Sequence, residues 1–226
     1  MLILFWIVIV FFYQGFQFAK PMRYFYPLYP FLAISSSYAF CYFFHKRINN
    51  FSIFLPFIIL FAVYPISFLM IYSRPHSRVI ASEWIYNHIP TGSTLSCEHW
   101  DDCLPLPVDG KSSQLYRIVT LSMYDLDTQK KWERINKQLE EIDYLILSSN
   151  RLWGSIPRAS WKYPMTSTFY VDLFSGKLKF DKIAEFTSRP TIPFLSFELI
   201  DDSADENFTV FDHPKVLIFR RQFDSF

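Results

Sequence analysis

The stretches YFYPLYPFLAISSSYAFCYFF, at positions 24–44, and SIFLPFIILFAVYPISFLMIY, at positions 52–72, decide the fold of this 226-residue chain. Each has 21 residues and no formal charge, which is enough for a helix to cross the ~30 Å hydrocarbon core of a bilayer. A third apolar run covers positions 1–18, although its uninterrupted part ends at Tyr13. The sequence therefore predicts an α-helical transmembrane bundle portion of about three spans, at about 1–18, 24–44 and 52–72.

The charges divide the chain at position 72. All 21 acidic residues follow that position, and only four of the 22 basic residues precede it. The remainder therefore has 18 basic and 21 acidic residues, a net charge of −3. Because a nucleic-acid-binding domain would carry a basic face, we predict no nucleic acid partner. The partner of residues 1–72 is predicted to be the lipid bilayer, which makes the chain an integral membrane protein.

Residues 73–226 are predicted to form a soluble α/β domain, because they are long enough to bury a core of their own. Asp127 is predicted to be the N-cap of a helix that runs to Asp143. The continuous apolar run DYLILSS, at 143–149, is typical of a strand buried in a parallel sheet. Segment 208–220 indicates a strand pair or a bulged strand. Further elements are predicted at 77–89 (helix), 94–97 (strand) and 116–122 (strand).

Three hydrophobic helices with few polar positions are unusual as a complete membrane domain, so we expect the chain to be the C-terminal part of a longer polytopic protein. Its missing N-terminal membrane helices would then be partners of these spans. Basic residues give the topology an ambiguous signal. Loop 45–50 contains two, and the opposite side contains Lys20, Arg23, Arg74 and Arg78. The positive-inside rule alone therefore predicts a cytoplasmic domain.

Five blocks of the sequence carry a resemblance to a known family. They are KPMRYFYPLYPFLAI (20–34), SRVIASEWIYNHIPTGSTLSCEHWDDCLPL (77–106), LSSNRLWGSIPR (147–158), YPMTSTFYVDLFSGKL (163–178) and ENFTVFDHPKVLIFRR (206–221). In this order they resemble the C-terminal part of bacterial C-type glycosyltransferases of the dolichyl-phosphate-mannose protein mannosyltransferase type. The resemblance implies an enzyme of the bacterial cell membrane that transfers a sugar from a polyprenyl-phosphate carrier to an acceptor. It also places residues 73–226 on the extracytoplasmic side, against the charge count.

The family's catalytic aspartate lies in an early extracytoplasmic loop, whereas the first carboxylate of this chain is Glu83. Because glycosyl transfer to an oxygen nucleophile needs a base, we expect no catalytic residue here and no activity of this chain alone. Arg23, and less strongly Lys20, are candidates for binding the carrier phosphate, which arginine grips through two hydrogen bonds. Interfacial anchoring is the alternative role for both cations. The alternative for the whole chain is a non-enzymatic, membrane-anchored module that binds a glycan or a peptide.

The acidic block Glu98, His99, Asp101 and Asp102 is a candidate for sugar or acceptor contacts. A divalent metal is an alternative without positive support, because a hard-cation site needs several converging oxygen ligands. A solvated loop is the simplest reading of the spacing. No metal site and no cofactor are therefore predicted.

Two further pairs of residues complete the candidate site. Cys97 and Cys103 flank the acidic block, and in an oxidising compartment we expect them to form a disulfide. Asn150 and Arg151 follow the buried strand at 143–149. Because ligands of open α/β sheets bind beyond the carboxyl ends of strands, both are candidates for acceptor or sugar contacts. Hydrogen bonds that tie the loop to the membrane part are an equally good explanation for Asn150 and Arg151.

Overall fold

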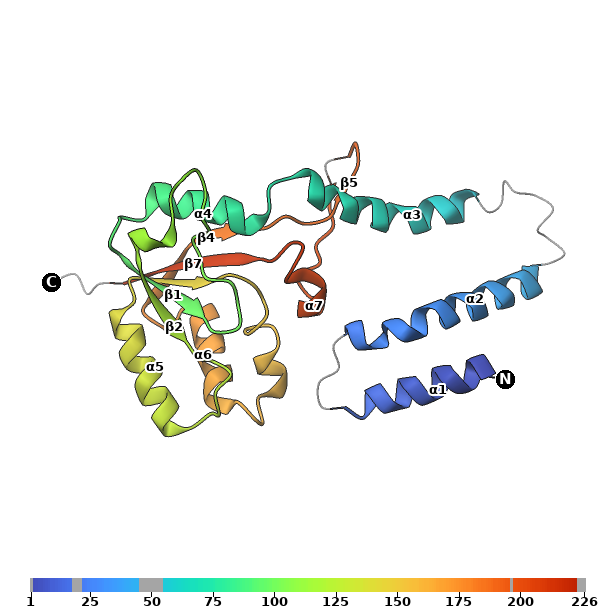
Figure 1. Cartoon of the computed structure of the whole chain (residues 1–226), viewed down its shortest axis with the longest axis horizontal. Coiled ribbons are helices and arrows are strands. Elements are labelled where there is room, and N and C mark those ends of the chain that lie inside the picture. Colours follow the sequence, from blue (N-terminus) through green and yellow to red (C-terminus); the bar gives the residue numbers. More distant parts are fainter. Residues whose placement is uncertain (1, 18–21, 45–54, 196, 223–226) are drawn as a thin grey trace.

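A computed structural model describes residues 2–17, 22–44, 55–195 and 197–222. In Figure 1 the N-terminal helices lie on one side, and an α/β domain built on a five-stranded sheet lies on the other. The strand order is β2-β1-β3-β7-β4. The strands are β1 (Thr94–Glu98), β2 (Arg117–Leu121), β3 (Tyr144–Leu147), β4 (Phe180–Phe186) and β7 (Val216–Arg221).

Strand directions bring several loops to one edge of the sheet. β1 pairs in parallel with β2 and β3, and β7 is antiparallel to both β3 and β4. The strands β1 to β4 therefore end at the same edge, where β7 begins. We call this the carboxyl edge; the segments that follow β1, β2 and β3 all leave from it.

Helices cover both faces of this sheet (Figure 1). One core packs α5 (Gln129–Glu141) and α6 (Pro164–Phe174) against Leu145 and Leu147 of β3. The other core packs α4 (Ser77–His88) against Ile146 of the same strand. Successive β3 side chains thus alternate between two buried layers, which is why the strand has no polar position. The predicted α/β class and the predicted helices and strands between positions 77 and 149 are confirmed, with small shifts of their ends.

The predicted N-cap of α5 is wrong by one residue. Thr128 has the extended backbone of a cap, with φ −116° and ψ 157°, and its side chain accepts a hydrogen bond from the Lys131 backbone N–H. Asp127 instead caps a different helix. Its carboxylate accepts hydrogen bonds from the backbone N–H groups of Met165 (2.6 Å) and Thr166 (3.1 Å), in the first turn of α6.

The prediction for segment 208–220 holds only in part, because the segment contains one strand and neither a strand pair nor a bulge. A short helix, α7 (Glu206–Thr209), precedes a single strand, β7. The Asp205 side chain accepts a hydrogen bond from the Asn207 backbone N–H at 3.0 Å, and this cap starts the helix. The strand that pairs with β7 is β4, which contains the register irregularity between Lys182 and Ala184.

The N-terminal helices are shorter than predicted. The 3₁₀ segment η1 (Met22–Leu28), which contains Pro27, replaces the start of the expected second span. The α-helix that follows has 16 residues, a length of only about 24 Å at 1.5 Å per residue. The helices are α1 (Leu2–Gly15), α2 (Tyr29–Phe44) and α3 (Leu55–Leu69), and η3 (Met70–Ser73) follows α3.

Within the described residues, one helical stretch, Ile58–His88, is long and apolar enough to cross a membrane. Its apolar part is α3 with η3, because Ala81 and Ile85 of α4 belong to the core of the domain. The three-span arrangement therefore stays a prediction. The end of the α1 and α2 pair that holds η1 points toward the domain (Figure 1). There η1 contacts α7.

Candidate functional site

Two adjoining cavities of about 790 and 590 Å³ lie between η1 and the carboxyl edge of the sheet. Arg23, Tyr124, Glu206 and Asn207 line both of them. We call the two together the interfacial cavity, because one wall comes from the N-terminal helices and the other from the domain. Its further lining residues include Tyr24, Trp100, Arg151, Arg158, Trp161 and Phe211.

Three arginines from distant parts of the chain line the interfacial cavity. The Arg23 guanidinium lies 5.4 Å from the centre of the Tyr24 ring. Arg151 lies at the same distance over the Phe211 ring and also donates to the Trp100 carbonyl. Arg158 forms an ion pair with Asp205 at 3.5 Å. This arrangement suits an anionic ligand, since arginine binds phosphate oxygens with paired N–H groups.

Glu206 brings a carboxyl group into the same cavity. It lies in the first turn of α7 and is half-buried. Burial raises the pKa of Glu206, and so does the charge of Asp205, whereas Arg151 and Arg23 act in the opposite direction. A carboxyl with a raised pKa is more easily neutral, which lessens its repulsion of an anionic ligand. No sequence pattern pointed to Glu206, because its place in the cavity depends on the contact between α7 and η1.

Hydrogen bonds position the wall that comes from the domain. Asn150 is buried, and its Oδ1 accepts a hydrogen bond from Thr209 Oγ1 at 3.0 Å, which ties α7 to the end of β3. The Tyr124 hydroxyl donates to the Arg151 carbonyl at 3.2 Å and lies 2.5 Å from Ser155 Oγ. Of the two predicted residues after β3, Arg151 lines the cavity. Asn150 has a structural role, but its hydrogen bond joins two parts of the domain and not, as the alternative had it, the loop and the membrane part.

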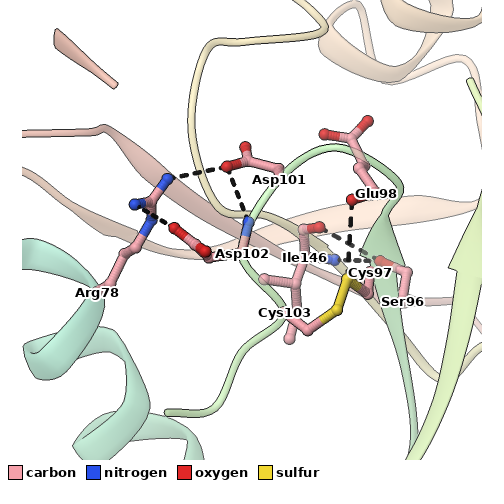
Figure 2. The surroundings of a disulfide bond; sticks show 8 residues. All are labelled: Arg78, Ser96, Cys97, Glu98, Asp101, Asp102, Cys103 and Ile146. Atoms are coloured by element: carbon pink, nitrogen blue, oxygen red, sulfur yellow. Dashed lines mark hydrogen bonds and ion pairs between the residues drawn. A yellow bond between two sulfur atoms is a disulfide. The ribbon is translucent and has the colours of Figure 1, made fainter. Parts of the chain in front are cut away.

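The acidic block holds α4 in place. Arg78, in the first turn of α4, pairs with Asp101 at 2.9 Å and with Asp102 at 2.6 Å (Figure 2). Its Nε also donates to the Ser148 carbonyl at 3.2 Å. The Asp101 side chain is only 1% exposed and accepts a further hydrogen bond from Ser149. The Asp101 carboxylate is thus engaged within the protein and does not face solvent, whereas Asp102 pairs with Arg78 but has a side chain that is 64% exposed.

The predicted disulfide is confirmed. Cys97, in β1, is bonded to Cys103, and the bond closes the loop that contains the acidic block (Figure 2). His99 is exposed in this loop, with its ring 5.0 Å from that of Trp100. Among the described residues, no group of His, Cys, Asp and Glu side chains is arranged to hold a metal ion.

Glu98 lies beneath this loop, in the interior of the domain. Its carboxyl accepts a hydrogen bond of 2.5 Å from the Tyr170 hydroxyl, and its other oxygen, Oε2, is buried without a partner among the described residues. Burial raises the pKa of Glu98 to about 8, although the Tyr170 hydrogen bond lowers it. This geometry does not match the predicted sugar contact, because the side chain faces α6. Instead, Glu98 is a neutral acid in the core at neutral pH.

The remaining predicted site residue, Lys20, lies outside the described residues. The structure thus brings Arg23 and Arg151 together and leaves Glu98, Asp101, Asp102 and Asn150 with partners elsewhere in the domain. No family model, no curated protein and no solved structure matches this chain. The family resemblance therefore rests on the sequence blocks alone.

Proposed function

We propose that this chain is the C-terminal portion of an integral membrane glycosyltransferase, which transfers a sugar from a polyprenyl-phosphate carrier to an extracytoplasmic acceptor. The observation that supports this function is the interfacial cavity, where Arg23, Arg151 and Arg158 meet. In the proposal, α1, α2 and α3 are three spans in a bacterial cell membrane and the α/β domain is extracytoplasmic. The spans pack against further, N-terminal membrane helices.

The lining of the interfacial cavity fits a lipid-linked sugar phosphate. The polyprenyl chain stays among the membrane helices, so the phosphate reaches the level of η1, where Arg23 binds it. The sugar then extends toward the domain, whose exposed Trp100, Trp161 and Phe211 offer aromatic faces. Aromatic walls with a few placed polar groups are typical of small-ligand sites. The acceptor proton goes to a base outside this chain in the proposal, as the family resemblance implies.

Carrier binding by the full chain in nanodiscs tests the proposal, with undecaprenyl phosphate as the probe. Arg23→Ala is expected to raise Kd about 10- to 150-fold, because one charge-assisted hydrogen bond contributes roughly 1.5–3 kcal/mol. Arg23→Lys keeps the charge but loses the paired N–H groups of arginine, so its Kd should lie between those of the unmodified chain and of Arg23→Ala. Arg134→Ala is the matched control, since Arg134 pairs with Asp125 on the exposed side of the domain. Its Kd should equal that of the unmodified chain.

Two results would contradict the proposal. The first is an unchanged Kd in both Arg23→Ala and Arg151→Ala, which would remove the carrier phosphate from the interfacial cavity. The second is binding of a free oligosaccharide together with no binding of undecaprenyl phosphate. That result would support the membrane-anchored binding module, which is favoured by the lack of any carboxylate before Glu83.

A further inference from the structure

A small hairpin next to α3 exposes a cluster of large apolar side chains. β5 (Thr191–Ile192) pairs antiparallel with β6 (Phe197–Glu198). At the tip between them, Phe194 is 104% exposed and Leu195 is 71% exposed. Phe197 and the nearby Ile200 are also exposed. No residue from Thr191 to Phe197 carries a formal charge. Apolar clusters of this kind mark protein or membrane contacts.

The backbone at the tip holds these side chains outward. Phe194 has a φ of +68°, a left-handed conformation that is a genuine outlier for a bulky residue. The Leu195 N–H donates to the Ile192 carbonyl at 3.3 Å, and the Leu199 N–H donates to the Pro190 carbonyl at 2.8 Å. The hairpin is thus closed by its own hydrogen bonds, and its apolar tip is presented at a defined place.

That place is the domain end of the membrane helix. β5 contacts both α3 and η3, and Figure 1 shows it beside the end of α3 that meets the domain. Arg74, directly after η3, donates to Thr191 Oγ1 at 2.9 Å and to the Arg189 carbonyl. The hairpin is therefore fixed to the domain end of α3. If α3 spans the membrane, as the proposed function has it, this is the depth where the span reaches the lipid headgroups.

The charges at the base of the hairpin also fit this depth. Glu198 is the one carboxylate of the hairpin, and it lies 3.9 Å from the Arg74 guanidinium and 3.6 Å from that of Arg189. Arg189 in turn makes two hydrogen bonds to the Asp202 carboxylate, at 3.0 and 2.8 Å. The hairpin thus has an apolar tip and a base of paired charges, the order of polarity found across a membrane surface.

We propose that the tip of this hairpin, with Phe194, Leu195 and Phe197, inserts into the lipid headgroup region beside α3 and is a second membrane contact of the domain. The occupant of the apolar surface is lipid, because the surface continues that of α3 and lies at its end. Shallow insertion is compatible with irregular backbone, since the headgroup region still offers water to free N–H and C=O groups. With α3, the hairpin makes a two-point attachment that restricts tilting of the domain over the membrane.

Site-specific fluorescence on the full chain in nanodiscs tests this contact. A single cysteine at Phe194→Cys carries an environment-sensitive label in a Cys41→Ser background, with the disulfide left intact. Lys130→Cys, on the exposed surface of α5, is the matched control. One set of nanodiscs contains lipid with a nitroxide near the headgroup. We expect the nitroxide to quench the label at position 194 and not the label at 130, and iodide quenching at 194 to be at least fivefold weaker.

Each other outcome overturns the inference. Equal iodide quenching at positions 194 and 130 would place the tip in water. Protection from iodide without quenching by the nitroxide lipid would mean that a protein surface, such as a second copy of this chain, covers the tip. Leu195→Cys supplies a second reporter if Phe194→Cys does not fold, because Leu195 belongs to the same exposed tip.

Discussion

The buried carboxyl of Glu98 makes the stability of the domain depend on pH. Burial raises the pKa of Glu98 from 4.5 to about 8. Below the lower value both the folded and the unfolded chain are protonated at this position. Between the two values the unfolded chain releases the proton and the folded chain keeps it. Unfolding is therefore favoured increasingly as the pH rises, and the dependence ends above pH 8, where both states are ionised.

The size of the effect follows from this difference in pKa. Each pH unit between about 4.5 and 8 costs about 1.4 kcal/mol, so the free energy of unfolding falls by about 5 kcal/mol across the interval. Glu98→Gln removes the titration and keeps an acceptor for the Tyr170 hydroxyl. Between pH 5 and pH 8 the difference is about 4 kcal/mol, so relative to this variant the melting temperature of the unmodified chain should fall by about 8–16 °C.

Near-ultraviolet circular dichroism of the detergent-solubilised chain measures this difference, because the domain core contains Tyr170 and Trp132. Tyr170→Phe gives a sharper control. Its hydroxyl lowers the pKa of Glu98, so its loss should extend the pH-dependent decline to higher pH. Melting curves of the unmodified chain and of Glu98→Gln that move in parallel from pH 5 to pH 8 would refute the reasoning, since Glu98 would then be ionised in the folded state.

Three further substitutions have expected results. Replacing both Cys97 and Cys103 with serine should lower the free energy of unfolding by about 2 kcal/mol in urea titrations, because the bond closes a short loop; an equal change in a reductant-treated sample confirms the cause. Lys131→Met should lower the free energy of unfolding by about 3–5 kcal/mol, because it leaves the buried Asp127 carboxylate without its cation. The double variant Lys131→Met, Asp127→Asn should regain part of this stability. Glu206→Gln should flatten the pH dependence of carrier binding, which otherwise weakens as Glu206 ionises above its raised pKa.

The spacing of apolar residues predicted those helices and strands whose apolar side chains all face the core of the domain. The strand Tyr144–Leu147 has only apolar and aromatic side chains because both faces of β3 are covered, and Trp132 and Ile135 of α5 recur at helical spacing toward one core. The disulfide was predictable from two cysteines in one short loop. Length alone predicted more spans than the structure confirms, because prolines such as Pro27 place part of an apolar run in 3₁₀ turns.

The rest depends on contacts between distant parts of the chain. β4 is an edge strand with mostly exposed positions, so its sequence lacks the apolar run of a central strand. Neither the position of β7 between β3 and β4 nor its direction is encoded locally. The same holds for the interfacial cavity. Arg23 was predictable from its place next to a span, whereas Glu206 becomes a neighbour of Arg23 only when α7 packs against η1.

The order of the first two elements of the domain explains why the cavity faces the N-terminal helices. α4 packs on the sheet and leads directly into β1, so it begins at the carboxyl edge and ends at the opposite edge. Arg78 fixes that start, through Ser148 after β3 and the two carboxylates after β1. Because α3 and η3 precede α4, the chain enters the domain at the carboxyl edge. Ligands of open α/β sheets bind at this edge, so the connection alone turns Arg151 and Arg158 toward the N-terminal helices, where η1 carries Arg23.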